Sequence, residues 1–186
     1  QYVDRICALY STEERPVHRE SFGPLTATLV PPAIAVAIEL AELLLAAEQG
    51  VKSFAVSFGQ TGSLIQDLAT ARVLRKLAQA YLQEFGFTDV RTYLVYHQWM
   101  GQFPHVREKA AALIAGSAMI AGMISADKVV VKTVDEALGV PRPEVNAEAV
   151  ENVRYTMRTF ACAAPVTSPL VDCEADLIES EVRSIL

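Results

Sequence analysis

The chain of 186 residues is long enough to form one domain with a sizeable hydrophobic core. Its composition, 52% hydrophobic and 20% charged residues, is typical of a folded globular protein and excludes a disordered one. The net charge of −6, without a visible basic face, argues against nucleic acid as the main partner, because phosphate binding requires clustered lysine and arginine.

The cysteines and the hydropathy of the chain indicate the cellular compartment of the protein. Cys7, Cys162 and Cys173 are odd in number, lie far apart and form no CxxC pair, which predicts reduced thiols in a cytoplasmic protein rather than a disulfide frame or a zinc site. No signal peptide and no run long enough to span a bilayer is recognisable. Because the chain starts at Gln1 and ends within a helical pattern, we expect it to be a piece of a longer protein.

Strands and helices alternate from residue 25 onward. The β-branched run "LTATLVPP" (25–32) predicts a strand that ends at two prolines. A run of helix formers (33–50) follows and stops at Gly50. "KSFAVSFG" (52–59) predicts a second, buried strand, and the leucine spacing predicts a helix over 63–86.

The second half continues this alternation before it changes. A third strand is predicted over 90–97, an Ala- and Gly-rich helix over 106–126, and a fourth strand over 127–133. Two helices, 144–161 and 172–186, then follow without a strand between them. Apolar strands separated by single helices predict parallel strands buried on both faces. Two architectures fit this pattern, an open doubly wound sheet or part of a (β/α)8 barrel, and both collect function at the carboxyl ends of the strands.

The strand ends carry few polar groups. The segment "GQTGS" (59–63) is the one Gly-rich turn from strand to helix, but it lacks the lysine of a phosphate-binding loop and is more simply a tight turn. No carboxylate pair, Ser–His–Asp set or metal-ligand spacing occurs at these ends, so we assign no catalytic residue and no metal site. The segment "VYHQWMGQFPH" (95–105) instead gathers aromatic side chains after the third strand.

Individual residues in these ends allow two interpretations each. His97 is either a hydrogen-bonded structural histidine or part of a pocket. Met100 and Phe103 follow the third strand together with the only tryptophan, Trp99. These side chains either belong to the core or form the wall of a cavity for a large flat ligand. Lys132, which closes a run of valines, either pairs with Glu136 on a helical turn or faces the pocket with it and grips ligand hydroxyls.

Four separated segments carry a more specific resemblance. In order and spacing the chain resembles the large (epsilon, or E) subunit family of glutamate mutase, also called methylaspartate mutase, at "SFGPLTATLVPP", "LLAAEQGVK", "HQWMGQFP" and "KVVVKT..EALGVP". The resemblance covers essentially residues 1–186. It implies one domain with an α/β fold of the (β/α)8 TIM-barrel type, of which this chain supplies the C-terminal half: the last four parallel strands, their crossover helices and the C-terminal helices.

The resemblance further implies an adenosylcobalamin-dependent isomerase, which rearranges the carbon skeleton of L-glutamate to 3-methylaspartate by a radical mechanism. The corrin is expected between the barrel mouth and a small cobalamin-binding (sigma, or S) subunit of a hetero-oligomer, and that subunit supplies the axial histidine. The arginine cluster that holds glutamate is expected outside this chain, so that the chain alone should be inactive. Carried over by position, the expected coenzyme contacts are Phe103, Lys132, Glu136 and Val140, with Phe22, His97 and Met100 lining the same cavity.

Two other functions fit the residues. The chain could be a non-catalytic half-barrel that needs a partner chain, because four parallel strands expose two sheet edges. It could also be an unrelated TIM-barrel lyase or aldolase that uses Lys132 as a Schiff-base amine.

Overall fold

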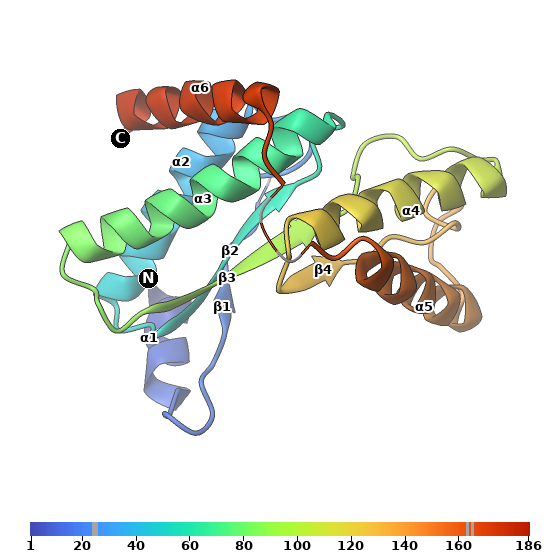
Figure 1. Ribbon diagram of the computed structural model, residues 1–186. Coiled ribbons are helices and arrows are strands. Elements are labelled where there is room, and N and C mark those ends of the chain that lie inside the picture. Colours follow the sequence, from blue (N-terminus) through green and yellow to red (C-terminus); the bar gives the residue numbers. More distant parts are fainter. Residues whose placement is uncertain (24–25, 163, 165) are drawn as a thin grey trace.

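The computed structural model describes residues 1–23, 26–162, 164 and 166–186. Within these residues the chain forms an α/β fold of six helices and one four-stranded parallel sheet (Figure 1). The strands are β1 (Arg19–Glu20), β2 (Ser53–Gly59), β3 (Arg91–His97) and β4 (Lys128–Val130). The helices are α1 (Tyr2–Tyr10), α2 (Pro32–Glu48), α3 (Leu64–Glu84), α4 (Arg107–Met123), α5 (Pro143–Thr159) and α6 (Pro169–Ile185).

The strand order decides between the two predicted architectures. The strands lie side by side in sequence order, β1-β2-β3-β4, and every pair is parallel. β2 and β3 pair over seven residues, from Ser53 opposite Arg91 to Gly59 opposite His97. A doubly wound sheet reverses its strand order at a switch point, and the four described strands contain no such reversal. The sheet is therefore of the half-barrel type.

The two faces of the sheet differ in cover. α2, α3 and α4 pack against one face, which we call the outer face, and meet there the side chains of Phe54, Val56, Phe58, Leu94 and Tyr96. Side chains alternate along a strand, and residues paired in register share a face. The opposite, inner face therefore carries Ser57, His97 and Lys128, and with them Glu20 of β1.

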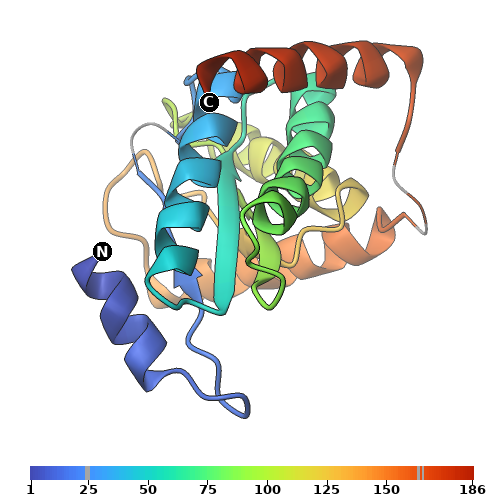
Figure 2. The ribbon, with the colours of Figure 1, turned by 90° about the vertical axis from the view of Figure 1, so that its left-hand side faces the viewer.

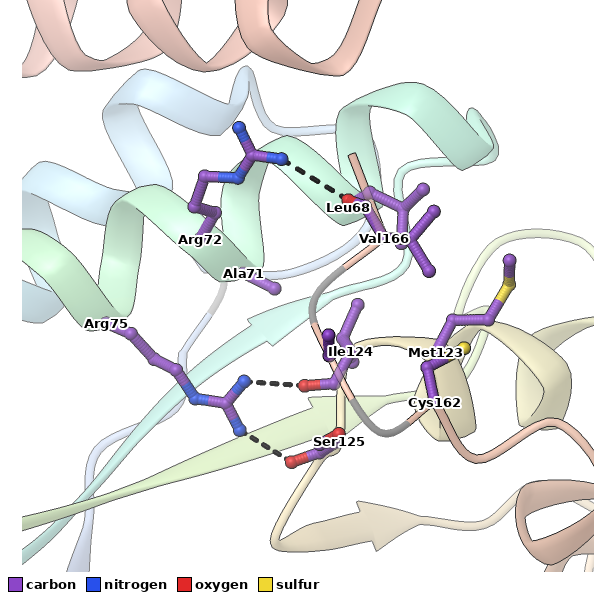
Figure 3. A pocket seen from close by; sticks show the side chains of 10 residues that line it. Leu68, Ala71, Arg72, Arg75, Met123, Ile124, Ser125, Cys162 and Val166 are labelled. Carbon is purple, nitrogen blue, oxygen red and sulfur yellow. Dashed lines mark hydrogen bonds between the residues drawn. The ribbon is translucent and has the colours of Figure 1, made fainter. Parts of the chain in front are cut away.

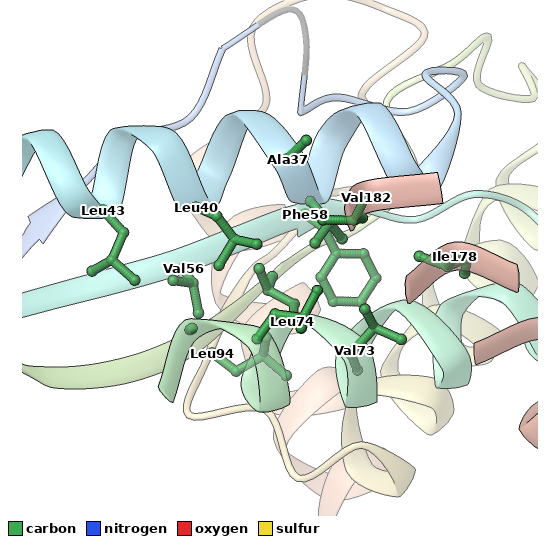
Figure 4. Close-up of a cluster of buried hydrophobic side chains, with 14 of the residues drawn as sticks. Ala37, Leu40, Leu43, Val56, Phe58, Val73, Leu74, Leu94, Ile178 and Val182 are labelled. Atoms are coloured by element: carbon green, nitrogen blue, oxygen red, sulfur yellow. The ribbon is translucent and has the colours of Figure 1, made fainter. Parts of the chain in front are cut away.

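The main core lies between the outer face and three helices. Figure 4 shows Leu40 of α2, Phe58 of β2 and Leu74 of α3 converging there, and each is almost completely buried. α6 lies across α2 and α3 (Figures 1 and 2) and closes this core with Ile178 and Val182. A second, smaller cluster between α4 and α5 consists of Phe103, Ala110, Ile114, Ala118 and Val153.

Five predicted helices are confirmed, and their ends show why they were recognisable. α2 starts at Pro32, where the missing N–H of proline costs no helical hydrogen bond, and the chain turns after it at Gly50 with φ +94°. The hydroxyl of Ser63 caps α3 by accepting a hydrogen bond from the Gln66 N–H. The short helix α1, which precedes the region of alternating pattern, was not predicted.

The predicted first strand, 25–32, is wrong. Leu25 lies outside the described residues, and 26–30 form turns that lead into α2. The Thr26 hydroxyl bonds to the backbone of Gly23, the Val30 N–H donates to Ala27, and Leu29 adopts a left-handed φ of 72°. These local bonds hold the segment in turns rather than in an extended strand. The first strand is instead the two-residue β1.

The predicted fourth strand, 127–133, is shorter than expected. Only Lys128–Val130 pairs with β3. Beyond it the N–H of Lys132 donates to the side-chain Oε1 of Gln98, at 2.8 Å, instead of to a strand backbone. A side chain thus replaces the ladder, which ends β4 early and frees the following segment to turn.

Candidate functional site

The carboxyl ends of the strands are joined into one edge by hydrogen bonds between neighbouring segments. We call carboxyl edge the segments that follow β2, β3 and β4 (60–63, 98–106 and 131–142) together with the turn 26–31.

Side-chain acceptors in one segment hold the backbone of another segment of this edge. Gln60 Oε1 accepts from the Trp99 N–H at 3.0 Å, and the Thr28 hydroxyl accepts from the Met100 N–H at 3.1 Å. Together with the Gln98 bond to Lys132, these contacts fix the loops relative to one another. A rigid edge is what a binding site built on loops requires.

Close packing adds to this rigidity at Gly59. A Cβ at this position would lie 2.6 Å from the backbone N of Thr28 and 3.0 Å from Cε of Met100. The Gly59 N–H also donates to the carbonyl of Thr26. The end of β2 and the turn that precedes α2 therefore touch through a site that only glycine fits.

Lys132 and Glu136 form an ion pair at the carboxyl edge. The Lys132 ammonium donates to Glu136 Oε1, and the two side chains keep 21% and 32% of their surface exposed. The pairing interpretation is thus confirmed, and the groups also remain accessible. An ammonium and a carboxylate side by side offer one donor and one acceptor to adjacent hydroxyls of a ligand.

His97 ends β3 on the inner face, inside a set of contacts that the sequence did not reveal. Its ring stacks on Phe22, with centroids 3.5 Å apart and planes 7° from parallel. Its Nε2 lies 2.9 Å from Glu20 Oε1, and Lys128 Nζ donates to Glu20 Oε2 at 2.6 Å. We name Glu20, His97 and Lys128 the inner-face triad. Alternation along "KVVVK" could have placed Lys128 on the face of Lys132, but no sequence signal marked Glu20.

Electrostatics keep the members of this triad in defined charge states. Burial raises the pKa of Glu20, but the hydrogen bonds from Lys128 and His97 outweigh it, so that the pKa lies below its ordinary value. Burial lowers the pKa of His97, although the bond to Glu20 opposes this. Glu20 is therefore a carboxylate and His97 is neutral near pH 7.

The remaining predicted residues lie at different depths. Met100 packs beside Gly59. Phe103 is 5% exposed and belongs to the second cluster, so that little of its ring is free for a ligand. Val140 is 97% exposed and follows Gly139, whose φ is +118°. The structure thus brings Phe22 together with His97, and Lys132 together with Glu136, while Phe103 and Val140 stand apart from these two pairs in burial.

A separate cavity of about 250 Å³ lies away from the carboxyl edge, between α3, the end of α4 and the segment before α6 (Figure 3). Two arginines line it, but both hold backbone. Arg75 donates to the carbonyls of Ile124 and Ser125, and Arg72 donates to that of Val166. These bonds stabilise the exit of α4 and the approach to α6, which makes the cavity structural.

Neither a metal-binding cluster nor a membrane-spanning helix is present in the part of the chain that the structure describes. Over residues 1–23, 26–162, 164 and 166–186, no three His, Cys, Asp or Glu side chains come together as a metal ion would need. Among the same residues, no helix has the length and hydrophobicity to cross a membrane.

Comparisons with known proteins place the whole chain in one group. The family model for the methylaspartate mutase E chain (MutE) matches residues 1–186. The glutamate mutase epsilon subunit of Escherichia coli O157:H7 is 44% identical over 186 residues, which are 100% of this chain and 39% of the relative. The subunits of the same name from Treponema denticola and Halobacterium salinarum are each 41% identical over the full chain, which corresponds to 38% of each relative. The chain thus spans about two fifths of the length of these relatives.

Proposed function

Because the chain belongs to the methylaspartate mutase E chain family, we propose that it forms part of the catalytic subunit of a glutamate mutase. The reaction is the reversible rearrangement of L-glutamate to 3-methylaspartate, with adenosylcobalamin as coenzyme. The observation that carries the proposal is the position of Lys132 and Glu136, a paired but accessible donor and acceptor on the carboxyl edge, in a chain that is 44% identical throughout to a glutamate mutase subunit.

We propose that the half-barrel sheet is completed to a (β/α)8 barrel by further strands, and that the chain is one domain, the C-terminal half of that barrel. Its sequential parallel strands and the helices on its outer face support this. β1 and β4 are both edge strands in the described sheet and offer their outer backbone groups for pairing.

The residues of the carboxyl edge fit an adenosylcobalamin ligand. The Lys132 ammonium and the Glu136 carboxylate match the two adjacent hydroxyls of a ribose, one as donor and one as acceptor. The exposed side chain of Val140 offers apolar contact, and we propose that the partly buried Phe22 and Met100 and the accessible part of Phe103 add further apolar contacts. We assign these residues, with His97, to the coenzyme side of the site.

The coenzyme supplies one-electron chemistry, which allows a hydrogen atom and a carbon fragment to exchange places on neighbouring carbons. The contribution of this chain is to bind, orient and exclude water. Charged groups near the site pair with each other: Lys132 with Glu136, and Lys128 with Glu20. The glutamate contacts themselves are proposed to come from the rest of the barrel.

We propose a hetero-oligomer in which a small cobalamin-binding (sigma) subunit docks on the carboxyl edge. Four apolar side chains on the described loops of this edge support a protein partner, because they are widely exposed: Leu29, Val106, Leu138 and Val140. The three free thiols favour a cytoplasmic enzyme.

The lyase alternative is disfavoured by the geometry of Lys132. A Schiff-base lysine must present its nitrogen to a carbonyl carbon, whereas Nζ of Lys132 is engaged by Glu136 Oε1. The non-catalytic half-barrel alternative makes a different prediction, since such a chain would be inactive in any assembly.

One reconstitution tests the proposed function. The complete protein that contains this chain is mixed with the cobalamin-binding subunit, adenosylcobalamin and L-glutamate, and the formation of 3-methylaspartate is followed. Omission of the cobalamin-binding subunit is the control and should abolish product. Product formation without that subunit, or none with every component and a correctly folded protein, would contradict the proposal.

A further inference from the structure

The inner-face triad links three strands through one carboxylate. Glu20 comes from β1, His97 from the end of β3, and Lys128 from the start of β4. One oxygen of Glu20 binds the imidazole and the other binds the ammonium, at 2.9 and 2.6 Å. The side chains of His97 and Glu20 are 9% and 21% exposed, whereas Lys128 is 59% exposed.

The charge of Glu20 determines which imidazole nitrogen carries the proton. The Lys128 ammonium donates to Glu20 Oε2 and favours the ionised form of this carboxyl group. An ionised carboxylate can only accept hydrogen bonds, so the proton in the contact with His97 resides on Nε2. Phe22, stacked on the ring, holds the imidazole in a single plane.

The other nitrogen, Nδ1, is left available. It makes no hydrogen bond with any residue that the structure describes. In the described ranges, the buried side-chain oxygen and nitrogen atoms that lack a hydrogen-bond partner are the hydroxyls of Thr70 and Ser117. Nδ1 of His97 is not among them. An unpartnered nitrogen on a ring that Glu20 holds at Nε2 and Phe22 holds by stacking is a preorganised hydrogen-bonding group.

We propose that Glu20 and Lys128 are positioning residues for His97: Glu20 holds the ring proton on Nε2 and the charge of Lys128 favours the neutral ring, so that Nδ1 accepts a hydrogen bond from a donor group of the bound ligand. The identity of this donor rests on the proposed function: it is either a ribose hydroxyl of the coenzyme or the ammonium group of glutamate. Both present an N–H or O–H to an acceptor, and the experiments below separate them.

A purely structural triad would make different predictions. It would join β1, β3 and β4 and contribute stability, and the state of the imidazole would not affect ligand binding. The readout must therefore report the ring itself and the affinity of the ligands, in addition to stability.

The first experiment reads the tautomer of His97. The complete protein, labelled with 15N at histidine, is studied by two-bond 1H–15N correlation spectra at pH 7.5, with His97→Asn as the assignment variant. We expect the tautomer protonated at Nε2. Glu20→Gln keeps the size of the side chain but presents both an acceptor and a donor to Nε2, so the second tautomer should appear. A wild-type ring protonated at Nδ1, or spectra unchanged in Glu20→Gln, would overturn the proposal.

The second experiment changes the charge and leaves the carboxylate in place. Lys128→Met should preserve the tautomer but raise the pKa of His97, because a nearby positive charge is removed while Glu20 stays and Lys132 still opposes protonation. Lys52→Met is the matched control, since Lys52 is an exposed lysine that also pairs with a carboxylate, Asp89, at the amino end of β2. A shift of the His97 titration in the control, or none in Lys128→Met, would refute the charge-state argument.

The third experiment identifies the ligand group. For Glu20→Gln we expect a roughly 10-fold loss of affinity for one ligand only, as for the loss of one oriented hydrogen bond near charged groups. Equilibrium binding of adenosylcobalamin to the assembled subunits reports the ribose, and the KM for glutamate at saturating coenzyme reports the ammonium. If Glu20→Gln alters the tautomer but leaves the affinity for each ligand at its wild-type value, the triad has only a structural role. Because the tautomer spectra need neither coenzyme nor turnover, they stand even if the proposed mutase activity fails.

Discussion

Glu39 is a carboxylic acid in the protein interior, and the hydrogen-bond count around it defines its protonation state. It is completely buried on α2, and its two oxygens contact the N–H and the hydroxyl of Ser57 at 3.0 and 3.2 Å. The same hydroxyl lies 3.0 Å from the carbonyl of Ser21. One hydroxyl carries one proton, so both contacts are hydrogen bonds only if Glu39 donates to Ser57 and Ser57 donates to Ser21. Burial accordingly raises the pKa of Glu39 to about 9.

Glu39→Gln should therefore stabilise the protein at neutral pH. In the folded protein Glu39 keeps its proton up to about pH 9, whereas in the unfolded chain it releases the proton near pH 4.5. The contribution of Glu39 to the free energy of unfolding is therefore fully present below pH 4.5 and is lost as the pH rises toward 9. At pH 7 the loss is about 3 kcal/mol. The amide reproduces both hydrogen bonds without ionising. Urea unfolding at pH 6, 7 and 8 should show a decline in the free energy of unfolding that the variant lacks.

Asp67 provides an internal reference for this measurement. It is also fully buried, and burial raises its pKa to about 6, against hydrogen bonds from the Thr61 N–H and the Tyr96 hydroxyl. The contribution of Asp67 to the free energy of unfolding is lost as the pH rises from 3.8 to 6, in the same direction as for Glu39. Glu39→Gln should leave that lower window unchanged. If the decline above pH 6 survives in the variant, Glu39 is ionised in the folded protein.

At the carboxyl edge, Lys132→Ala should weaken coenzyme use more than glutamate use. Removal of the ammonium deletes one donor toward the ribose and leaves Glu136 without its partner. We expect the adenosylcobalamin concentration at half-maximal rate to rise about 10-fold, with the KM for glutamate nearly constant. Lys52→Ala serves as the exposed-lysine control. Equal changes in both constants would count against a ribose contact.

At the scale of elements, the strongly periodic segments were predictable and the short, polar ones were not. α2, α3 and α4 follow from helix formers, a serine cap and glycine stops, and β2 and β3 follow from continuous apolar runs. β1 escaped because a two-residue strand with charged side chains has no recognisable period. The strand predicted over 25–32 is wrong because β-branched residues favour strands only where a neighbouring strand can pair with them.

The candidate site divides in the same way. Lys132 and Glu136 were foreseeable because they are four residues apart on one turn. The link between Glu20, His97 and Lys128 spans 108 residues of sequence, and no local pattern encodes it. Pairing register determines such contacts, and register is a property of the folded sheet.

Gly59→Ala tests how tightly β2 is joined to the turn before α2. The added methyl group would lie 2.6 Å from backbone N of Thr28, which cannot rotate away. We expect a loss of about 1–3 kcal/mol in the free energy of unfolding and a change in the environment of the Met100 methyl group, read by 13C-methyl NMR. Gly116→Ala is the matched control, because Gly116 is exposed within α4 and has open space at its Cβ. It should stabilise by up to about 1 kcal/mol. Equal effects of the two changes would show that close packing at Gly59 is unimportant.

At the scale of the whole molecule, the half-barrel sheet is asymmetric in its cover. Its outer face is sealed by α2, α3 and α4 with a continuous apolar core. Its inner face carries the inner-face triad, whose groups include the 59% exposed Lys128. In a TIM barrel the interior is filled by packed side chains and the active site lies at the carboxyl ends of the strands. If the proposed barrel forms, the inner-face triad would lie on the side of the sheet that faces this interior.

The two edges of the sheet lead to the last prediction. β1 and β4 each pair on one side only within the described sheet, and α1 beside β1 exposes the side chains of Tyr2, Leu9 and Tyr10. Unpaired strand edges and an uncovered apolar helix face favour association. Residues 1–186 produced alone should therefore self-associate in multi-angle light scattering. Addition of the remaining residues of the complete protein as a second polypeptide should convert the aggregate to a one-to-one complex, with slower amide hydrogen exchange at 19–20 and 128–130. A stable monomer that does not bind the second polypeptide would mean that these edges are not interfaces, and that the four strands do not belong to a larger barrel.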